Sequence, residues 1–148
     1  MNMSPLMLNT VHKPMKKIDV VAAVIFSRCG KKIFLAKRPD DSHQGGLWEF
    51  PGGKKEEGES AYQALARELE EELAIKVRTA DSLVKINHDY GDKLIELDVY
   101  KVTAFEGEPF GAEGQKTQWV ELADINQYKF PAANQAIIDA LIGSEQSL

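Results

Sequence analysis

The order of apolar and polar residues predicts strands in the first third of the chain. The continuous run of branched apolar residues at 20–26 is typical of a buried strand. Residues 27–31, which include a glycine, predict a hairpin loop, and residues 33–36 predict the returning strand. A loop rich in Pro, Asp and Gly follows at 39–46, and a short strand is then expected at 48–50.

The pattern changes to a helical period between residues 60 and 73. Ser60 and Gln63 form the two halves of a capping box, which is a start signal for a helix. Apolar residues then recur every fourth position and form one stripe along the predicted helix. The stripe consists of Ala61, Leu65, Leu69 and Leu73.

The second half of the chain returns to strands and ends in another helix. Strands are expected at 83–88 and 95–102, and apolar and acidic residues alternate along the second, so one of its faces is expected to contact water. A glycine-rich loop at 107–114 precedes a short strand at 119–122. Pro131 is expected to occupy the first turn of a final helix that runs to about residue 142.

These elements predict a single folded domain without repeats or linkers. Residues 1–17 are interpreted as a flexible N-terminal extension, ordered structure is expected from Ile18 onward, and the domain comprises residues 18–148. Strands mixed with two helices indicate the α+β class, in which sheet and helices form one sandwich.

Composition and charge narrow the range of partners. The chain has 148 residues, 43% of them apolar and 28% charged, which is enough to bury a core. Acidic residues number 23 and basic residues 18, so the formal net charge is −5. Because bulk negative charge disfavours binding to duplex DNA or anionic membranes, we expect no nucleic-acid or membrane partner, although a local basic patch could bind a small anion.

The cysteine content and the N-terminal residues indicate a cytoplasmic protein. Cys29 is the single cysteine, so neither an internal disulfide nor a thiolate metal cluster can form, and a reducing compartment fits. No apolar run reaches the roughly 18 residues that a membrane span needs. The first residues lack an apolar block before a small-residue cleavage site, so no secretory signal is expected.

An unusual concentration of glutamates marks the first predicted helix and the loop before it. Residues 53–75 contain seven Glu but only three basic residues. At about 100° per residue, Glu72 falls inside the apolar stripe, with Glu68 at its edge and Glu71 beside it. Spacings of three and four bring these like charges together, which destabilises a helix. Arg67 points in another direction, so it is not expected to compensate all three.

Two explanations of this arrangement remain open from the residues alone. The carboxylates could belong to a partly buried helix edge, or they could surround a cation. Clustered carboxylates without His or Cys favour Mg²⁺ or Mn²⁺ over Zn²⁺, and such ions commonly share their ligand shell with substrate phosphates. The second explanation therefore predicts phosphate chemistry.

The same segment matches a known family pattern over 23 residues, from Gly53 to Ile75. Several charged positions must match at fixed spacing, so the pattern is specific. The segment resembles the Nudix box through Gly53, Glu59, Arg67, Glu68, Leu69, Glu71, Glu72 and Ile75. The family's usual glycine is Ala74 here, and if that position needs a positive φ, alanine costs about 1 kcal/mol. The departure affects the turn and not the acidic residues.

The resemblance extends over residues 18–142. The segments 47–54 (LWEFPGGK), 107–115 (GEPFGAEGQ) and 130–134 (FPAAN) are similar to corresponding segments of the MutT-type 8-oxo-dGTP diphosphatases within this family. The resemblance implies an α/β/α sandwich with a central mixed β-sheet. It also implies hydrolysis of an oxidised purine nucleoside triphosphate to its monophosphate and pyrophosphate, which keeps damaged bases out of DNA.

The resemblance assigns the acidic residues to a metal site. It implies that Glu68, Glu71, Glu72 and the backbone carbonyl of Gly52 bind Mg²⁺, with Mn²⁺ as a substitute. Glu68 is the first candidate to polarise the attacking water, and Glu113 is the second candidate and a further metal ligand. A supporting role is implied for Gly53 and for an ion pair between Glu59 and Arg67.

The remaining expected site residues concern a small-molecule nucleotide substrate. Asn134 is the candidate reader of the base, because its amide offers both a donor and an acceptor; a purely structural bond to a nearby carbonyl is the alternative. The resemblance also places Arg38, His43, Glu49, Phe50, Pro51, Gly52 and Lys54 at the substrate. Lys93 stands where related enzymes have Arg, so it lacks the planar guanidinium fork.

Rival functions remain compatible with this pattern. The box reads the diphosphate and not the base, so the substrate could be a dinucleotide cofactor, an ordinary triphosphate or a capped RNA end. A non-catalytic nucleotide-binding domain is a further alternative, although such a domain is expected to have lost one or more of the helix glutamates. We expect the protein to act as a monomer.

Overall fold

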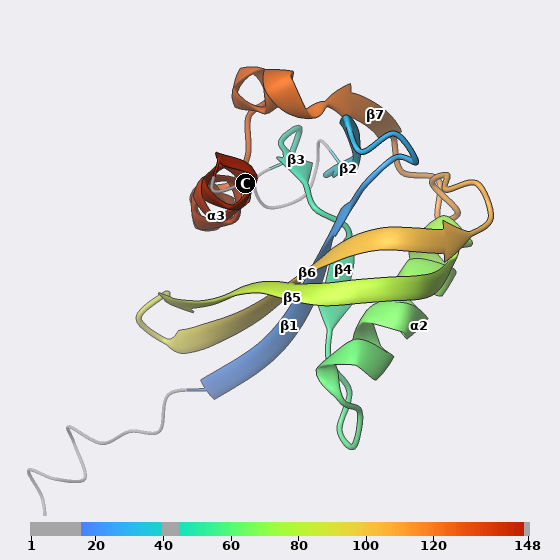
Figure 1. Ribbon diagram of the computed structural model, residues 1–148. Coiled ribbons are helices and arrows are strands. Elements are labelled where there is room, and N and C mark those ends of the chain that lie inside the picture. The colour runs from blue at the N-terminus through green and yellow to red at the C-terminus, as the bar shows by residue number, and fades with distance from the viewer. Residues whose placement is uncertain (1–15, 40–44, 147–148) are drawn as a thin grey trace, which may run out of the picture.

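A four-stranded mixed sheet forms the centre of the computed structural model, which describes residues 16–39 and 45–146 (Figure 1). Its strands lie in the order β4-β1-β6-β5. Strands β1 and β6 run parallel, whereas β4 pairs with β1 and β5 with β6 in antiparallel fashion. The bounds are β1 (Lys16–Ile25), β4 (Gly52–Lys54), β5 (Lys76–Asp89) and β6 (Lys93–Glu106).

Strand β1 begins two residues before the expected start of ordered structure at Ile18. Lys16 and Lys17 already pair with the start of β6. The Lys17 ammonium also lies 2.9 Å from a carboxylate oxygen of Glu96. Neither residue is apolar, so a search for hydrophobic runs does not detect this end of the strand. The rest of the expected extension, residues 1–15, lies outside the described residues.

Strands β5 and β6 are much longer than expected and form the long hairpin visible in Figure 1. Register shifts interrupt their pairing between Val77 and Val84, which breaks the two-residue period that predicts a strand. The acidic face of β6 is less wet than expected, since Glu96 and Asp98 are half-buried.

A second, antiparallel sheet of three strands adds to the predicted architecture. It contains β2 (Lys32–Lys37), β3 (Trp48–Glu49) and β7 (Thr117–Glu121), in the order β3-β2-β7. A bridge between Phe26 and Ile33 connects the end of β1 to this sheet. Two short 3₁₀ helices, η1 (Leu122–Gln127) and η2 (Ala132–Asn134), follow β7.

The core forms two clusters that lie on opposite faces of β1, as the alternation of its side chains requires. Val21, Ala23 and Ile25 pack against α2 (Ala61–Leu73). Ala22 and Val24 pack in the cluster that contains α3 (Gln135–Gln146). The α+β sandwich with helices around a mixed sheet is therefore confirmed.

Helix α2 starts and ends at the predicted residues. The Ser60 side chain accepts a hydrogen bond from the Gln63 N–H, and the Gln63 side chain accepts one from the Ser60 N–H, so the capping box is confirmed. At the other end Ala74 adopts φ 60° and ψ 35°, which is the left-handed conformation. The stripe residues Leu65, Leu69 and Leu73 are fully buried.

The final helix differs from the prediction at both ends. Pro131 caps η2 and does not open the α-helix, which begins at Gln135 and extends to Gln146. Asn134 is the last residue of this 3₁₀ turn and directly precedes the α-helix. No helix among the described residues is long and apolar enough to cross a membrane.

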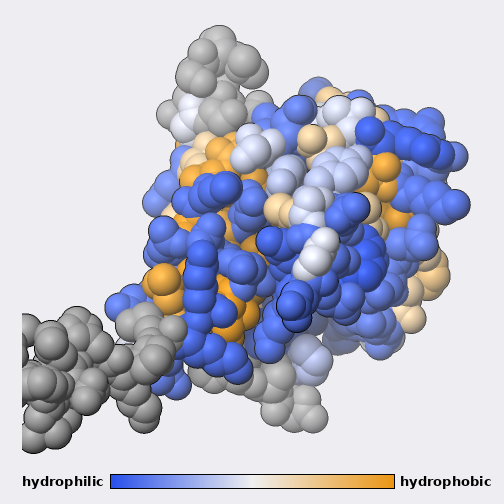
Figure 2. Space-filling view, turned by 90° about the horizontal axis from the view of Figure 1, so that it is seen from below, coloured by the Kyte–Doolittle hydropathy of each residue, from blue (hydrophilic) through white to orange (hydrophobic). Residues whose placement is uncertain are grey.

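The surface below the sheet is mainly hydrophilic, with apolar side chains visible between charged ones (Figure 2). Among the described residues, the large apolar side chains that are exposed are Tyr62, Tyr90 and Phe110. Most of the described apolar surface is therefore covered within the two core clusters.

Replacement of Ala74 tests the conformation at the end of α2. Ala74→Gly should raise the free energy of unfolding by about 1 kcal/mol, because glycine adopts positive φ without a steric penalty. The control Ala66→Gly, inside the same helix, should lower it by about 1 kcal/mol. Urea unfolding measures both, and a loss of stability in Ala74→Gly would contradict the left-handed conformation.

Candidate active site

The carboxylates of α2 meet the backbone of the short strand β4. The N–H of Gly52 donates a 3.1 Å hydrogen bond to Oε2 of Glu72. A Cβ at Gly53 would lie 2.5 Å from the Glu68 carboxyl carbon, so a side chain there would displace this carboxylate. Gly52 and Gly53, expected to turn the chain, instead form the start of β4, and Glu68 and Glu72 lie against this strand.

Burial and mutual repulsion act on these two carboxylates. Burial, then the charges of Glu68 and Glu113, raise the pKa of Glu72 to about 8. Burial also raises the pKa of Glu68, where the Arg67 guanidinium acts in the opposite direction. Glu72 thus lies in the apolar stripe as predicted and holds its charge at a cost in free energy.

Arg67 contacts more of the glutamates than the sequence predicted. It donates to both carboxylate oxygens of Glu59, at 2.7 and 2.9 Å, and holds the pKa of Glu59 down at about 2. Contrary to the expectation that it points elsewhere, its guanidinium also contacts Glu68 at 2.9 Å and Glu71 at 3.5 Å. Glu72 accepts a hydrogen bond from the Gly52 N–H instead. Arg67 therefore does not compensate all three helix carboxylates, as expected.

Glu113 lies in the loop after β6, close to the helix carboxylates. Its charge acts on both Glu68 and Glu72. A hollow of about 210 Å³ is lined by Glu72, Glu113 and Gln115, together with Glu49 and Pro51. The loop therefore brings a further carboxylate to the helix, as the sequence predicted.

The acidic residues do not form a ready-made cage for a metal ion. In the described part of the chain, no three acidic, His or Cys side chains are grouped closely enough to hold one. The Glu71 side chain is 55% exposed and turns toward Arg67. The donor chemistry still fits a hard divalent cation, because Glu72 is a buried carboxylate repelled by two others and a cation would relieve that repulsion.

A cleft of about 560 Å³ runs from β4 to the turn before α3. Its size suits a nucleotide-sized ligand. The expected substrate residues Arg38, Glu49, Phe50, Gly52, Lys54 and Asn134 all line it. Pro51 lines the neighbouring hollow instead, and its carbonyl accepts a 2.8 Å bond from Ala23. His43 lies outside the described residues.

An ion pair and an aromatic pair hold the cleft walls in place. The Arg38 guanidinium donates to the Glu49 carboxylate at 2.9 Å. The buried Phe50 ring stacks on Phe130, with ring centroids 5.3 Å apart and an angle of 11° between the planes. Phe50 therefore serves the core and the cleft at once.

Asn134 lies half-buried at the far end of the cleft from the helix carboxylates. Its backbone N–H bonds the carbonyl of Pro131 at 2.9 Å, which fixes the 3₁₀ turn. The structure gives its side-chain amide no hydrogen bond to any other described residue. The structural alternative, a bond from this amide to a nearby carbonyl, is therefore not observed.

Several cleft residues were not expected from the sequence. Tyr90, at the tip of the β5–β6 hairpin, lines the cleft, and its ring centroid lies 5.5 Å from the ammonium of Lys93, a cleft residue that the sequence already singled out. Ile95 and Leu97 supply an apolar wall from β6. Their alternation signalled an apolar face, but the pattern could not tell a cleft wall from core.

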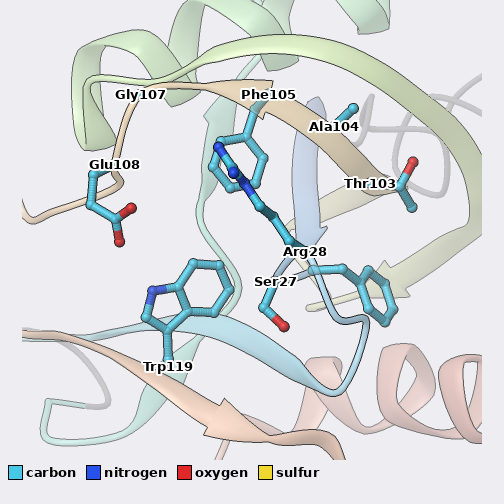
Figure 3. A pocket seen from close by; sticks show the side chains of 9 residues that line it. Ser27, Arg28, Thr103, Ala104, Phe105, Gly107, Glu108 and Trp119 are labelled. Atoms are coloured by element: carbon cyan, nitrogen blue, oxygen red, sulfur yellow. The ribbon is translucent and has the colours of Figure 1, made fainter.

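A separate hollow of about 380 Å³ lies by the ends of β1 and β6 (Figure 3). The side chains of Arg28, Phe105, Glu108 and Trp119 surround it. None of the expected site residues lines this hollow, so it is not the candidate active site.

Comparison with known proteins shows the family to which this fold belongs. The fold and the acidic helix with its Gly-Gly strand define a Nudix domain, and a model of the NUDIX domain matches residues 21–140. The chain therefore belongs to the Nudix family.

Several individual members of this family are similar to the chain over most of its length. The chain is 38% identical to the 8-oxo-dGTP diphosphatase of Escherichia coli over 86% of its length and 98% of that protein. It is 40% identical to the CTP pyrophosphohydrolase of the same organism, over 86% and 93%. A solved MutT structure, from work on Aliivibrio salmonicida and Vibrio cholerae, aligns with TM-score 0.80 and 44% identity over 87% of this chain and 99% of that one.

The raised pKa of Glu72 predicts a pH-dependent stability of the metal-free protein. The folded state binds the Glu72 proton more tightly than the unfolded state, so the free energy of unfolding should fall as pH rises from about 4.5 to about 8. Glu72→Gln should reduce this slope, and the control Glu70→Gln, an exposed carboxylate on the same helix, should retain it. Urea unfolding with chelator present tests this, and an equal slope in all three proteins would refute the burial of Glu72.

Proposed function

We propose that the protein is a Mg²⁺-dependent pyrophosphohydrolase that converts 8-oxo-dGTP to 8-oxo-dGMP and pyrophosphate. One observation carries this proposal: a single cleft connects the strand beside the helix carboxylates to the amide of Asn134. A triphosphate can therefore lie at one end while its base lies at the other. The likeness to named 8-oxo-dGTP diphosphatases points to the same substrate.

The metal end of the site is assigned to the acidic residues. Glu68, Glu71, Glu72 and Glu113, with the Gly52 carbonyl, would hold Mg²⁺, which supplies charge neutralisation at the phosphate oxygens when bound. Mn²⁺ is the expected substitute. Arg67 and Glu59 keep the helix and the preceding loop in register, so that these carboxylates stay on one side of β4.

Hydrolysis needs a base for the attacking water. Glu68 is proposed for this role, because burial raises its proton affinity while Arg67 orients its carboxylate. Glu113 is the alternative. The base takes a proton from the water as its oxygen adds to phosphorus, and the P–O bond between the α- and β-phosphates breaks, which gives the nucleoside monophosphate and pyrophosphate. Hydrolysis in oxygen-18 water shows which phosphorus is attacked.

Basic residues are proposed to receive the phosphates. Arg38 and Lys54 line the cleft between β4 and its mouth, and each offers charge-assisted donors. His43 is assigned to the same role on the resemblance alone. Arg38 is held by Glu49, so its guanidinium is already oriented before a substrate arrives.

The other end of the cleft is proposed to read the base. The half-buried Asn134 amide can donate and accept at a purine edge, and Phe50, Ile95 and Leu97 provide apolar surface. Tyr90 adds an aromatic face at the hairpin tip. We propose that the enzyme works as a monomer on free nucleotides in the cytoplasm.

A second candidate substrate is an undamaged nucleotide such as CTP. The relative named CTP pyrophosphohydrolase is as similar to this chain as several of the relatives named for 8-oxo-dGTP. Lys93 also lacks the bidentate fork of an arginine, which would weaken selection at the base. A non-catalytic binding domain is disfavoured, since every box glutamate is present.

A nucleotide panel with and without Mg²⁺ tests the proposed function. We expect the highest kcat/KM for 8-oxo-dGTP over dGTP, CTP and a dinucleotide, with no hydrolysis once Mg²⁺ is chelated. Glu68→Gln should lower kcat by about 10²- to 10⁴-fold with the fold intact. Equal kcat/KM for dGTP and 8-oxo-dGTP would defeat the substrate assignment, and near-normal turnover of Glu68→Gln would defeat the role of Glu68.

Replacement of Asn134 tests base recognition separately from the chemistry. Asn134→Ala should reduce the preference for 8-oxo-dGTP over dGTP by about 10- to 100-fold, because a lost pair of hydrogen bonds costs about 1–3 kcal/mol. Hydrolysis of dGTP should persist. The control Asn126→Ala, in η1 and outside the cleft, should keep the wild-type ratio; an unchanged ratio in Asn134→Ala would remove Asn134 as the base reader.

A further inference from the structure

The loop that carries Glu113 is fastened to the end of α2 by the side chain of Gln115. We infer that Gln115 is a positioning residue that holds Glu113 at the helix carboxylates. The inference rests on the proposed function, because it concerns the residue proposed as metal ligand or base. It deepens that function by naming the contact that brings Glu113 to the site.

Both ends of the Gln115 amide are engaged. Its Nε2 donates to the backbone carbonyl of Glu72 at 3.1 Å, and its Oε1 accepts from the backbone N–H of Glu113 at 2.9 Å. Rotation of the amide by 180° would place donor against donor and acceptor against acceptor, so this orientation is favoured. One side chain thus connects the backbone of Glu113 directly to the backbone of Glu72.

The loop also supplies backbone donors to the same helix end. The N–H of Ala112 bonds the Glu72 carbonyl at 2.9 Å, and the N–H of Phe110 bonds the Leu73 carbonyl at 3.3 Å. The last carbonyls of a helix have no partner within the helix, so they need donors from elsewhere. The Glu72 carbonyl receives two, one from each side of Glu113 along the chain.

Glycines allow the loop to close tightly around Gln115. A Cβ at Gly111 would lie 2.0 Å from the Gln115 carbonyl oxygen, so no other residue fits there. The N–H of Gly114 bonds the Gly111 carbonyl at 3.0 Å, and Gly114 has φ +84°. The tight turn therefore fixes the backbone of Gln115 within the loop, and its side chain bonds to the end of α2.

Repulsion between carboxylates opposes the position of this loop, so the loop needs hydrogen bonds that hold it at the helix. Glu113 is exposed, and its charge repels those of Glu68 and Glu72. Without a counterion this repulsion favours a loop that moves away from the helix, and the neutral Gln115 amide opposes that movement without adding charge. Because the amide acts on the backbone of Glu113, it limits where that carboxylate can reach.

The test replaces the amide by an apolar side chain of similar length, Gln115→Met. In the metal-free protein, hydrogen exchange of the Glu113 amide should become faster, since its acceptor is lost. Mn²⁺ affinity and kcat should each fall by about 10- to 100-fold, as is typical when a group that orients a ligand is removed. KM should change less than kcat.

Combination with Glu113→Gln separates positioning from a general effect on folding. If Gln115 acts through Glu113, Gln115→Met should add little further loss of kcat or Mn²⁺ affinity in a Glu113→Gln background. The control Gln118→Met removes a glutamine from an exposed position on β7 and should resemble wild type throughout. Gln115→Glu, which retains the acceptor but loses the donor, should show slow exchange at Glu113 and an intermediate kcat.

Opposite results would overturn the inference. Full additivity of the two substitutions, or unchanged Glu113 exchange in Gln115→Met, would show that Gln115 does not act on Glu113. If Gln115→Met fails to fold, Gln115→Glu tests the loss of the bond to the Glu72 carbonyl alone, and wild-type kcat and Mn²⁺ affinity there overturn the inference. Failure of the proposed function would be distinct, because wild type would then split no nucleotide while exchange and Mn²⁺ binding still report on Gln115.

Discussion

The burial of the Glu72 carboxylate against β4 is the constraint on which the site depends. A carboxylate in an apolar stripe is unfavourable unless the surroundings supply donors or a cation. The chain supplies one N–H, from Gly52, and then brings Glu68 and Glu113 close enough to add repulsion. Such an arrangement lowers the stability of the protein, and a bound cation would relieve the repulsion.

Two sets of contacts, one from Arg67 and one from the loop that carries Gln115, keep the mutually repelling carboxylates close together. Arg67 bridges Glu59 before the helix to Glu68 on it, so the loop and the first half of α2 move as one unit. At the other end of α2, Gln115 and the loop backbone cap the last carbonyls of the helix. Ion pairs therefore hold Glu68 and the loop before the helix, whereas neutral hydrogen bonds hold the C-terminal end of the helix.

The two ends of the cleft have different chemical character. Strand β4 and its basic neighbours face the charged end, while Phe50, Ile95 and Asn134 form a mostly apolar end with a single amide. Strand β1 connects β4 with the apolar wall from β6, because it pairs with both strands. Changes at the apolar end can therefore alter the shape of the cleft without disturbing the helix carboxylates, which do not line it.

The sequence by itself determined α2, its caps and the acidic face, because a helix places residues on a face through a fixed local period. The resemblance, through the box and the segments 47–54 and 130–134, added the family and several cleft residues. Only the tertiary structure decided the contacts of Arg67, the length of the β5–β6 hairpin, the 3₁₀ turn at Asn134 and the place of Gln115. These depend on which distant segments pack together, and a contact such as Gln115 to Glu72, 43 positions apart, leaves no periodic signal along the chain.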